Sequence, residues 1–122
     1  MTLKKIPESE LEIMKVIWSN KSPISSKEIV EIMHEKKEWK NTTTLTLLSR
    51  LLKKNFINAA KEKRVTYYTP IVSEKDYIKS ETTSFFKKFH NNSLKNFIST
   101  LRESNTITDE DLDELEQWIK NR

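Results

Sequence analysis

The feature that most constrains the fold is a change in hydrophobic period at residues 54 and 55. Upstream of this point, apolar residues recur at the spacing of α-helices over residues 8–19, 25–35 and 42–54. Downstream, two short runs rich in β-branched and aromatic residues flank the sequence KEKR, which is the pattern of a β-hairpin with a basic tip. The first half of the chain is therefore predicted to fold as three helices followed by a hairpin. Asn55 is expected to form the turn after the third helix, since asparagine tolerates left-handed backbone.

The third predicted helix, residues 42–54 with Asn41 as its expected cap, has an unusual polar face. At about 100° per residue, its leucines fall largely on one arc, together with Thr44. The opposite arc carries short hydroxyl side chains and cations: Thr42, Thr43, Thr46, Ser49, Arg50 and Lys53. The major groove of DNA accepts a helix with a slim polar surface, where a threonine hydroxyl can bind a phosphate or a base edge. We therefore predict that this helix recognises DNA; an ordinary amphipathic helix with a solvated polar face is the alternative.

Cations gather around this helix and the hairpin that follows it. The chain carries a net charge of +4, and residues 36–64 hold nine Lys or Arg against two Glu, whereas residues 109–116 hold six carboxylates. A local basic surface favours a polyanionic partner such as double-stranded DNA. The predicted hairpin tip carries Lys61, Lys63 and Arg64, which we expect to contact phosphates beside the recognition helix.

The remainder of the chain is predicted to be helical, with helix starts near Ser73, Ser93 and Thr108. The patterns together predict a mainly α protein with two domains. Residues 1–71 would form a winged helix-turn-helix DNA-binding domain of three helices and a small β-hairpin wing, and residues 72–122 a three-helix dimerisation domain. Large apolar residues are expected to form the homodimer interface, since they need a partner surface: Tyr77, Phe85, Phe86, Phe89, Leu112, Leu115 and Trp118. A ligand pocket lined by the three phenylalanines is the alternative.

Several segments resemble the winged helix of the BlaI/MecI-type penicillinase repressors: SELEIMKVIW, SSKEIVEIM, WKNTTTLTLLSRLLKKNFI and RVTYYTP. The layout of the C-terminal helices, ending in the acidic ITDEDLDEL, is also similar, so the resemblance covers nearly the whole chain. It implies a homodimeric transcriptional repressor that binds inverted repeats of the TACA/TGTA kind, and it points to a β-lactam-resistance or related stress operon. Three positions depart from the family pattern: Asn55 replaces a frequent glycine, Leu45 a polar or basic residue, and Thr44 a valine-like residue.

The resemblance also raises a regulatory protease as a partner, because penicillinase repressors are inactivated by cleavage of an Asn-Phe bond in the C-terminal domain. This chain contains such a bond between Asn96 and Phe97. Aligned without gaps from ITDEDLDEL, the family's cleaved bond falls instead between Thr100 and Leu101, four residues later. We therefore interpret the Asn96-Phe97 bond as a coincidence of sequence.

Composition argues against catalysis. The sequence has no glycine, which rules out glycine-rich phosphate loops, and no cysteine, which rules out thiol catalysis and cysteine metal ligands. We expect no enzyme activity, no cofactor and no metal site, and we interpret His34 and His90 as surface or capping residues. Trp18 and Trp39 are expected to serve in packing.

No membrane span or signal peptide is recognised, so a cytoplasmic protein is expected. A winged helix that binds a protein partner as an adaptor is the alternative function.

Overall fold

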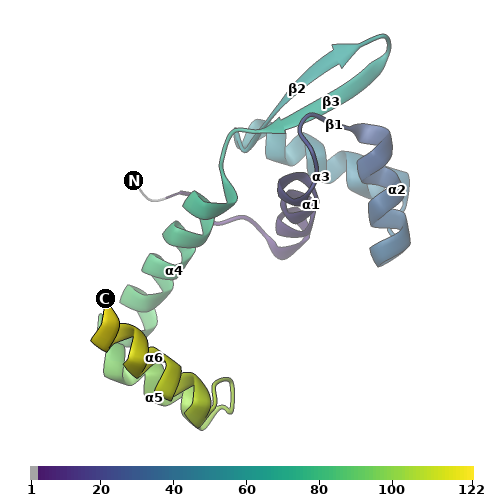
Figure 1. Ribbon diagram of the computed structural model, residues 1–122. Coiled ribbons are helices and arrows are strands. Elements are labelled where there is room, and N and C mark those ends of the chain that lie inside the picture. Colours follow the sequence, from purple (N-terminus) through teal and green to yellow (C-terminus); the bar gives the residue numbers. More distant parts are fainter. Residues whose placement is uncertain (1–2) are drawn as a thin grey trace. The chain divides into compact units, whose positions relative to one another are not determined.

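A computed structural model describes residues 3–122 of the chain. Six α-helices and three short β-strands occur within these residues (Figure 1). In chain order they are α1 (Glu8–Ser19), β1 (Ile24–Ser25), α2 (Ser26–Lys37), α3 (Asn41–Lys53), β2 (Ile57–Glu62), β3 (Val65–Pro70), α4 (Glu74–His90), α5 (Leu94–Glu103) and α6 (Asp109–Asn121). The predicted succession of three helices, a hairpin and three further helices is confirmed, and with it the mainly α class.

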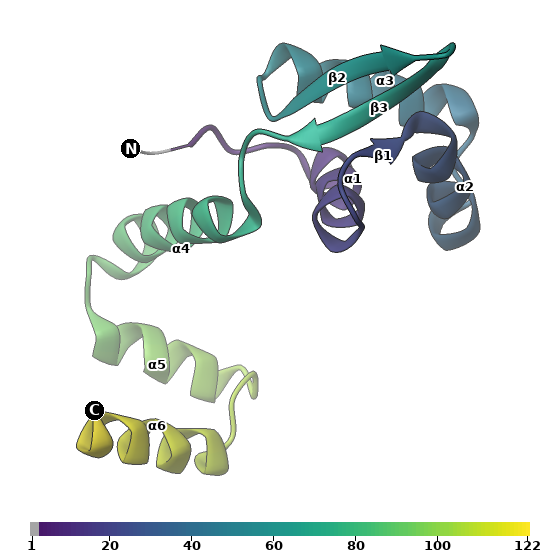
Figure 2. The ribbon, with the colours of Figure 1, turned by 45° about the horizontal axis from the view of Figure 1, so that its top comes forward.

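The strands form one antiparallel sheet in the order β1-β3-β2, with β3 at its centre. β2 pairs with β3 along its whole length, and Ile57 lies opposite Pro70 at the base of the hairpin. Figure 2 shows the two long strands of this wing with β1 beside β3. The sequence did not predict β1, because a strand of two residues has no period of its own. It forms only where Ile24 meets Tyr68 of β3.

The three N-terminal helices enclose an apolar core with one face of this sheet. Their buried residues follow helical spacing: Ile13, Met14 and Ile17 in α1, Ile29 and Met33 in α2, and Leu47, Leu48 and Leu51 in α3. Phe56, Ile57 and Tyr68 close the core from the wing. Trp18 and Trp39 pack against this cluster, which confirms their predicted packing role.

Residues with a positive φ make the turns of this glycine-free chain. Asn55 follows α3 with a φ of 60°, and the N–H groups of Asn55 and Phe56 donate to the carbonyls of Leu52 and Leu51 at 3.1 and 3.0 Å. This is a Schellman ending in which asparagine takes the place that glycine usually holds, as predicted for this residue. Positive φ also occurs at Glu38, Lys63 and Arg64, which are residue types that seldom adopt it.

Two helix boundaries differ from the predictions. The second helix continues to Lys37 instead of ending near residue 35, and the left-handed backbone of Glu38 ends it. The third helix already includes Asn41, which was expected to cap it. Lys40 has the extended backbone of the cap residue, so the prediction was wrong, and no side chain caps this helix.

The chain divides into two compact units, of which the first ends at Glu81 and the second comprises residues 82–122. The first unit continues past the wing because the start of α4 packs on it. There the Tyr77 hydroxyl accepts a hydrogen bond from the N–H of Ile6 at 3.0 Å. The predicted division of DNA-binding and dimerisation roles at residues 71 and 72 stays a prediction. Within residues 3–122, no helix has both the length and the apolar character needed to cross a bilayer.

Candidate nucleic-acid interface

The outer face of α3 presents the side chains that were predicted to bind DNA. All six are exposed: Thr42, Thr43, Thr46, Ser49, Arg50 and Lys53. The opposite arc is buried: Thr44, Leu47, Leu48 and Leu51. The predicted division of this helix into two arcs is confirmed, because packing of the leucine arc in the core directs the other arc to solvent. A role in DNA binding stays a prediction for the exposed residues.

A shallow depression of about 280 Å³ lies on this face of α3, lined by Thr42, Thr43, Thr46, Leu47 and Arg50. A threonine hydroxyl both donates and accepts hydrogen bonds, and the arginine guanidinium offers donors in a planar fork that matches guanine or phosphate. The depression therefore combines groups that can bind base edges with a positive charge, on a helix face without bulky side chains.

The wing ends in a turn formed by Lys63 and Arg64, with φ values of 49° and 70°. Two successive positive φ values suit the twist of a hairpin, but they normally use Asn-Gly. Side chains with a Cβ adopt this backbone at a cost of about 1–2 kcal/mol per residue. The turn is shorter than the predicted KEKR tip, since Lys61 and Glu62 still belong to β2. It places two cations together at the end of the wing.

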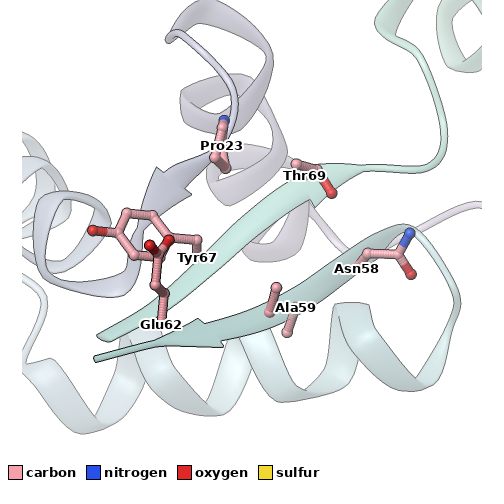
Figure 3. A pocket seen from close by; sticks show the side chains of 7 residues that line it. Pro23, Asn58, Ala59, Glu62, Tyr67 and Thr69 are labelled. Atoms are coloured by element: carbon pink, nitrogen blue, oxygen red, sulfur yellow. The ribbon is translucent and has the colours of Figure 1, made fainter. Parts of the chain in front are cut away.

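Side chains of β2 alternate between the two faces of the wing. Lys61 alternates onto the same face of β2 as Ile57, which is buried under the helices, so Lys61 projects on the same side as α3. Glu62 projects on the other face beside Tyr67, as Figure 3 shows. A hollow of about 370 Å³ lies there, and the described residues that line it include Glu62 but neither Lys nor Arg. The acidic side chain of the wing therefore points away from the basic face.

Ion pairs leave the cations of this face available. Within residues 3–122, they join Lys15 to Glu12, Lys54 to Glu10, Arg102 to Asp109, and Lys120 to Glu116. In this described part of the chain, Arg50, Lys53 and the wing cations are in none of these pairs. Lys54, although it belongs to the basic stretch of the sequence, is held by the buried carboxylate of Glu10.

The two histidines have different surroundings. His34 is exposed on α2, as expected. His90 is buried at the end of α4, where its ring packs against Phe97 and its Nδ1 hydrogen-bonds the side chain of Asn96. The interpretation of His90 as a surface or capping residue was therefore wrong. In the described part of the chain, no group of three or more His, Cys, Asp or Glu side chains could hold a metal ion.

The predicted dimerisation residues fall into two groups. Tyr77 is buried in the first unit, where its ring packs against Trp18 and Phe56. The others belong to residues 82–122, in which His90 is the only buried residue. Phe85, Phe89 and Trp118 are exposed, and Phe86, Leu112 and Leu115 are partly exposed. The structure adds exposed apolar residues that the sequence analysis did not select, although their helical spacing was readable: Ile78, Leu94 and Ile119.

Comparisons with known proteins agree with this arrangement. Residues 6–121 match the sequence model of a protein family described as "Penicillinase repressor". The chain is 38% identical over 126 residues to the penicillinase repressor of Bacillus licheniformis, with 98% of each chain covered. It is 26% identical over 118 residues to the methicillin resistance regulatory protein MecI of Staphylococcus aureus strain N315, with 97% of this chain and 95% of the relative covered.

Two solved structures are similar to part of the chain. One is the solution structure of the DNA-binding domain of the repressor BlaI, which is 41% identical, with a TM-score of 0.56 over 63% of this chain and 94% of that chain. The other is the monomeric form of Bacillus licheniformis BlaI in complex with the blaP half-operator, also 41% identical, with a TM-score of 0.54 over 62% and 92%. The predicted winged-helix fold is confirmed.

Proposed function

This chain belongs to the penicillinase repressor family, a family of transcriptional repressors and not of enzymes, and we propose that it binds an inverted-repeat operator in double-stranded DNA as a homodimer. One observation carries the proposal: the exposed threonine and arginine face of α3, within a winged helix whose 41% identical relative was solved with a half-operator. The names of the relatives extend the proposal to control of a β-lactam-resistance or related stress operon.

In the proposed complex, α3 lies in the major groove and the wing lies along the adjacent backbone. Thr43, Thr46 and Arg50 contact base edges. Thr42, Ser49 and Lys53 bind phosphate oxygens or base edges, depending on their depth in the groove. Lys61, Lys63 and Arg64 bind phosphates, which positions the helix without reading sequence.

Dimerisation is proposed for the second unit. Residues 82–122 have no fully buried apolar side chain within one copy, and their large apolar residues are exposed or partly exposed. Phe85 and Phe89 lie four residues apart on one stripe of α4, with 4.9 Å between their ring centroids. A second copy is the occupant that an operator of two half-sites requires, since two-fold symmetric DNA is matched by a two-fold symmetric protein.

A regulatory protease belongs to the same proposal, although the bond between Asn96 and Phe97 is part of a helix in the folded chain. This bond lies in the first turn of α5, where the N–H of Asn96 donates to the Ser93 hydroxyl at 3.1 Å. The Phe97 ring packs edge-on against Phe86 and His90. Cleavage there requires this helix to unfold locally. The packing agrees with the interpretation of this Asn-Phe pair as a coincidence.

The alternative, an adaptor that binds only protein, does not account for the exposed cations beside the threonine face. A cytoplasmic location follows from the DNA partner and is part of the proposal.

The decisive experiment is selection of operators from a random duplex pool by the intact protein. We expect enrichment of an inverted repeat related to TACA/TGTA, with an affinity that falls steeply as salt rises. Enrichment of no duplex would overturn the proposal.

Sedimentation of the intact chain tests the dimer separately. We expect a dimer at micromolar concentration, and a monomer for Phe89→Glu, which places a charge on the apolar stripe of α4. Ser84→Glu is the matched control, because it adds the same charge to a different side of the same helix. A monomeric wild-type protein, or equal effects of the two substitutions, would contradict the proposed interface.

A further inference from the structure

Leu45 is an apolar side chain displayed on the helix that is proposed to enter DNA. It is 46% exposed, in the first half of α3. Among the described residues, Leu52 of the same helix packs against the hydrophobic core, whereas Leu45 is outside both the core and its packed neighbours. Internal packing therefore does not explain a leucine at this position.

Leu45 adjoins the polar face of α3. Thr42 lies three residues before it and Ser49 four residues after it, so both are its neighbours on the helix surface. Among the described residues of the first unit, the other exposed large apolar side chains lie outside α3: Val65, Ile71 and Ile78. Leu45 is thus an isolated apolar group at the border of the candidate reading surface, and the first half of a recognition helix is the part that contacts base edges.

We infer that Leu45 reads the C5 methyl group of a thymine in each operator half-site, an inference that rests on the proposed DNA-binding function. The thymine methyl is the apolar group that base pairs present in the major groove. Leucine has no hydrogen-bonding group, so it recognises this methyl by excluding water from both surfaces. Burying one methyl group contributes about a fourfold change in affinity. Leu45 thereby selects thymine over cytosine, which carries only hydrogen at this carbon.

Replacement of thymine by deoxyuridine tests the inference, because it removes only the methyl group and keeps every hydrogen bond of the base pair. The probe is the duplex selected by the intact protein, with each thymine replaced in turn and in both half-sites. Wild type, Leu45→Ala and Ile71→Ala are titrated against every duplex at one salt concentration. Ile71 is the matched control, since it is 50% exposed in the first unit but outside α3. Circular dichroism melting verifies that each variant is folded.

We expect one thymine position at which deoxyuridine weakens wild-type binding by about fourfold per half-site. Leu45→Ala should bind the two duplexes equally at that position, while Ile71→Ala should retain the wild-type difference. If Leu45→Ala still bound every deoxyuridine duplex more weakly by the wild-type factor, the thymine methyl groups would be contacted by the threonines instead. That result would overturn the inference. Insensitivity of the wild type to every replacement would also overturn it, while leaving the proposed function intact. Failure of the wild type to select any duplex would remove the proposed function itself.

Discussion

Glu10 and Lys54 form an ion pair that joins α1 to the end of α3, with 2.6 Å between the carboxylate Oε1 and the ammonium Nζ. The Glu10 side chain is 1% exposed and that of Lys54 is 24% exposed. A carboxylate this deeply buried requires a partner that compensates for its lost hydration. The pair therefore fixes the end of α3 against the core, and its two members contribute unequally to stability.

Loss of the cation should destabilise the protein more than neutralisation of the carboxylate. In Lys54→Met, Glu10 remains buried without its partner, and we expect a loss of about 3 kcal/mol, the low end for broken buried pairs, because Lys54 is partly exposed. Glu10→Gln still accepts a hydrogen bond from Lys54, so the loss should be about 1 kcal/mol. Urea unfolding measures the free energy of unfolding of both variants. Lys53→Met is the control, because it removes an exposed cation next to Lys54 in the sequence. Equal losses for the two variants would show that the buried charge is not the cause.

Thr44→Val should stabilise the protein. Within the described residues, the Thr44 hydroxyl is buried and has no hydrogen-bond partner. Valine has nearly the same shape without the hydroxyl, so its introduction should raise the free energy of unfolding by about 1 kcal/mol. Thermal melting is the measurement, and Thr46→Val, which alters an exposed hydroxyl of the same helix, should change the melting temperature little. A less stable Thr44→Val protein would mean that the hydroxyl is bonded in solution.

Replacing the wing turn by Asn-Gly should separate stability from DNA binding. The double variant Lys63→Asn, Arg64→Gly removes the left-handed strain at both positions and should melt at a higher temperature. It also removes two cations, so it should bind all duplexes more weakly, with the salt slope reduced by about 2. The control is Lys87→Gln, Lys95→Gln, which removes two cations from the second unit. An unchanged slope in the wing variant would place the wing away from phosphates.

Stability should decline in alkaline solution through Tyr68. Burial raises the pKa of its phenol above the ordinary value of 10.0. The pKa is therefore higher in the folded chain than in the unfolded chain. The stability contributed by the neutral, buried phenol is complete below a pH of about 10 and is lost as the pH rises through the folded pKa. Tyr68→Phe should show a smaller decline in melting temperature above that pH. Identical alkaline declines in wild type and variant would contradict the prediction. Burial also raises the pKa of Tyr77, so part of the decline should remain.

The two arcs of α3 could be predicted because burial of a helix face repeats with the period of the helix. Thr44 and Leu48 follow the buried arc, and Thr46 lies on the exposed one, as their spacing required. The Schellman turn at Asn55 was also readable, since asparagine tolerates left-handed backbone and ends a helical period there.

Features that depend on contacts distant in sequence were not readable. The ion pair between Glu10 and Lys54 spans 44 residues, and only folding shows that one cation of the basic stretch is engaged. The burial of His90 depends on its contact with Phe97 across a turn. Lys63 and Arg64 have side chains that normally avoid positive φ, so the tertiary pairing of the wing, and not local preference, determines their turn.

The most direct test of operator reading by α3 is a measurement of how well three variants discriminate operator from scrambled duplex. The variants are Thr43→Ala, Thr46→Ala and Arg50→Ala. Each variant is titrated against both duplexes at one fixed salt concentration, after melting confirms that it is folded. Thr46→Ala should lose about 1–3 kcal/mol of discrimination. Arg50→Ala should lose more, because it also removes a charge that binds guanine or phosphate. Wild-type discrimination in all three variants would mean that α3 does not read the operator, and would contradict the account.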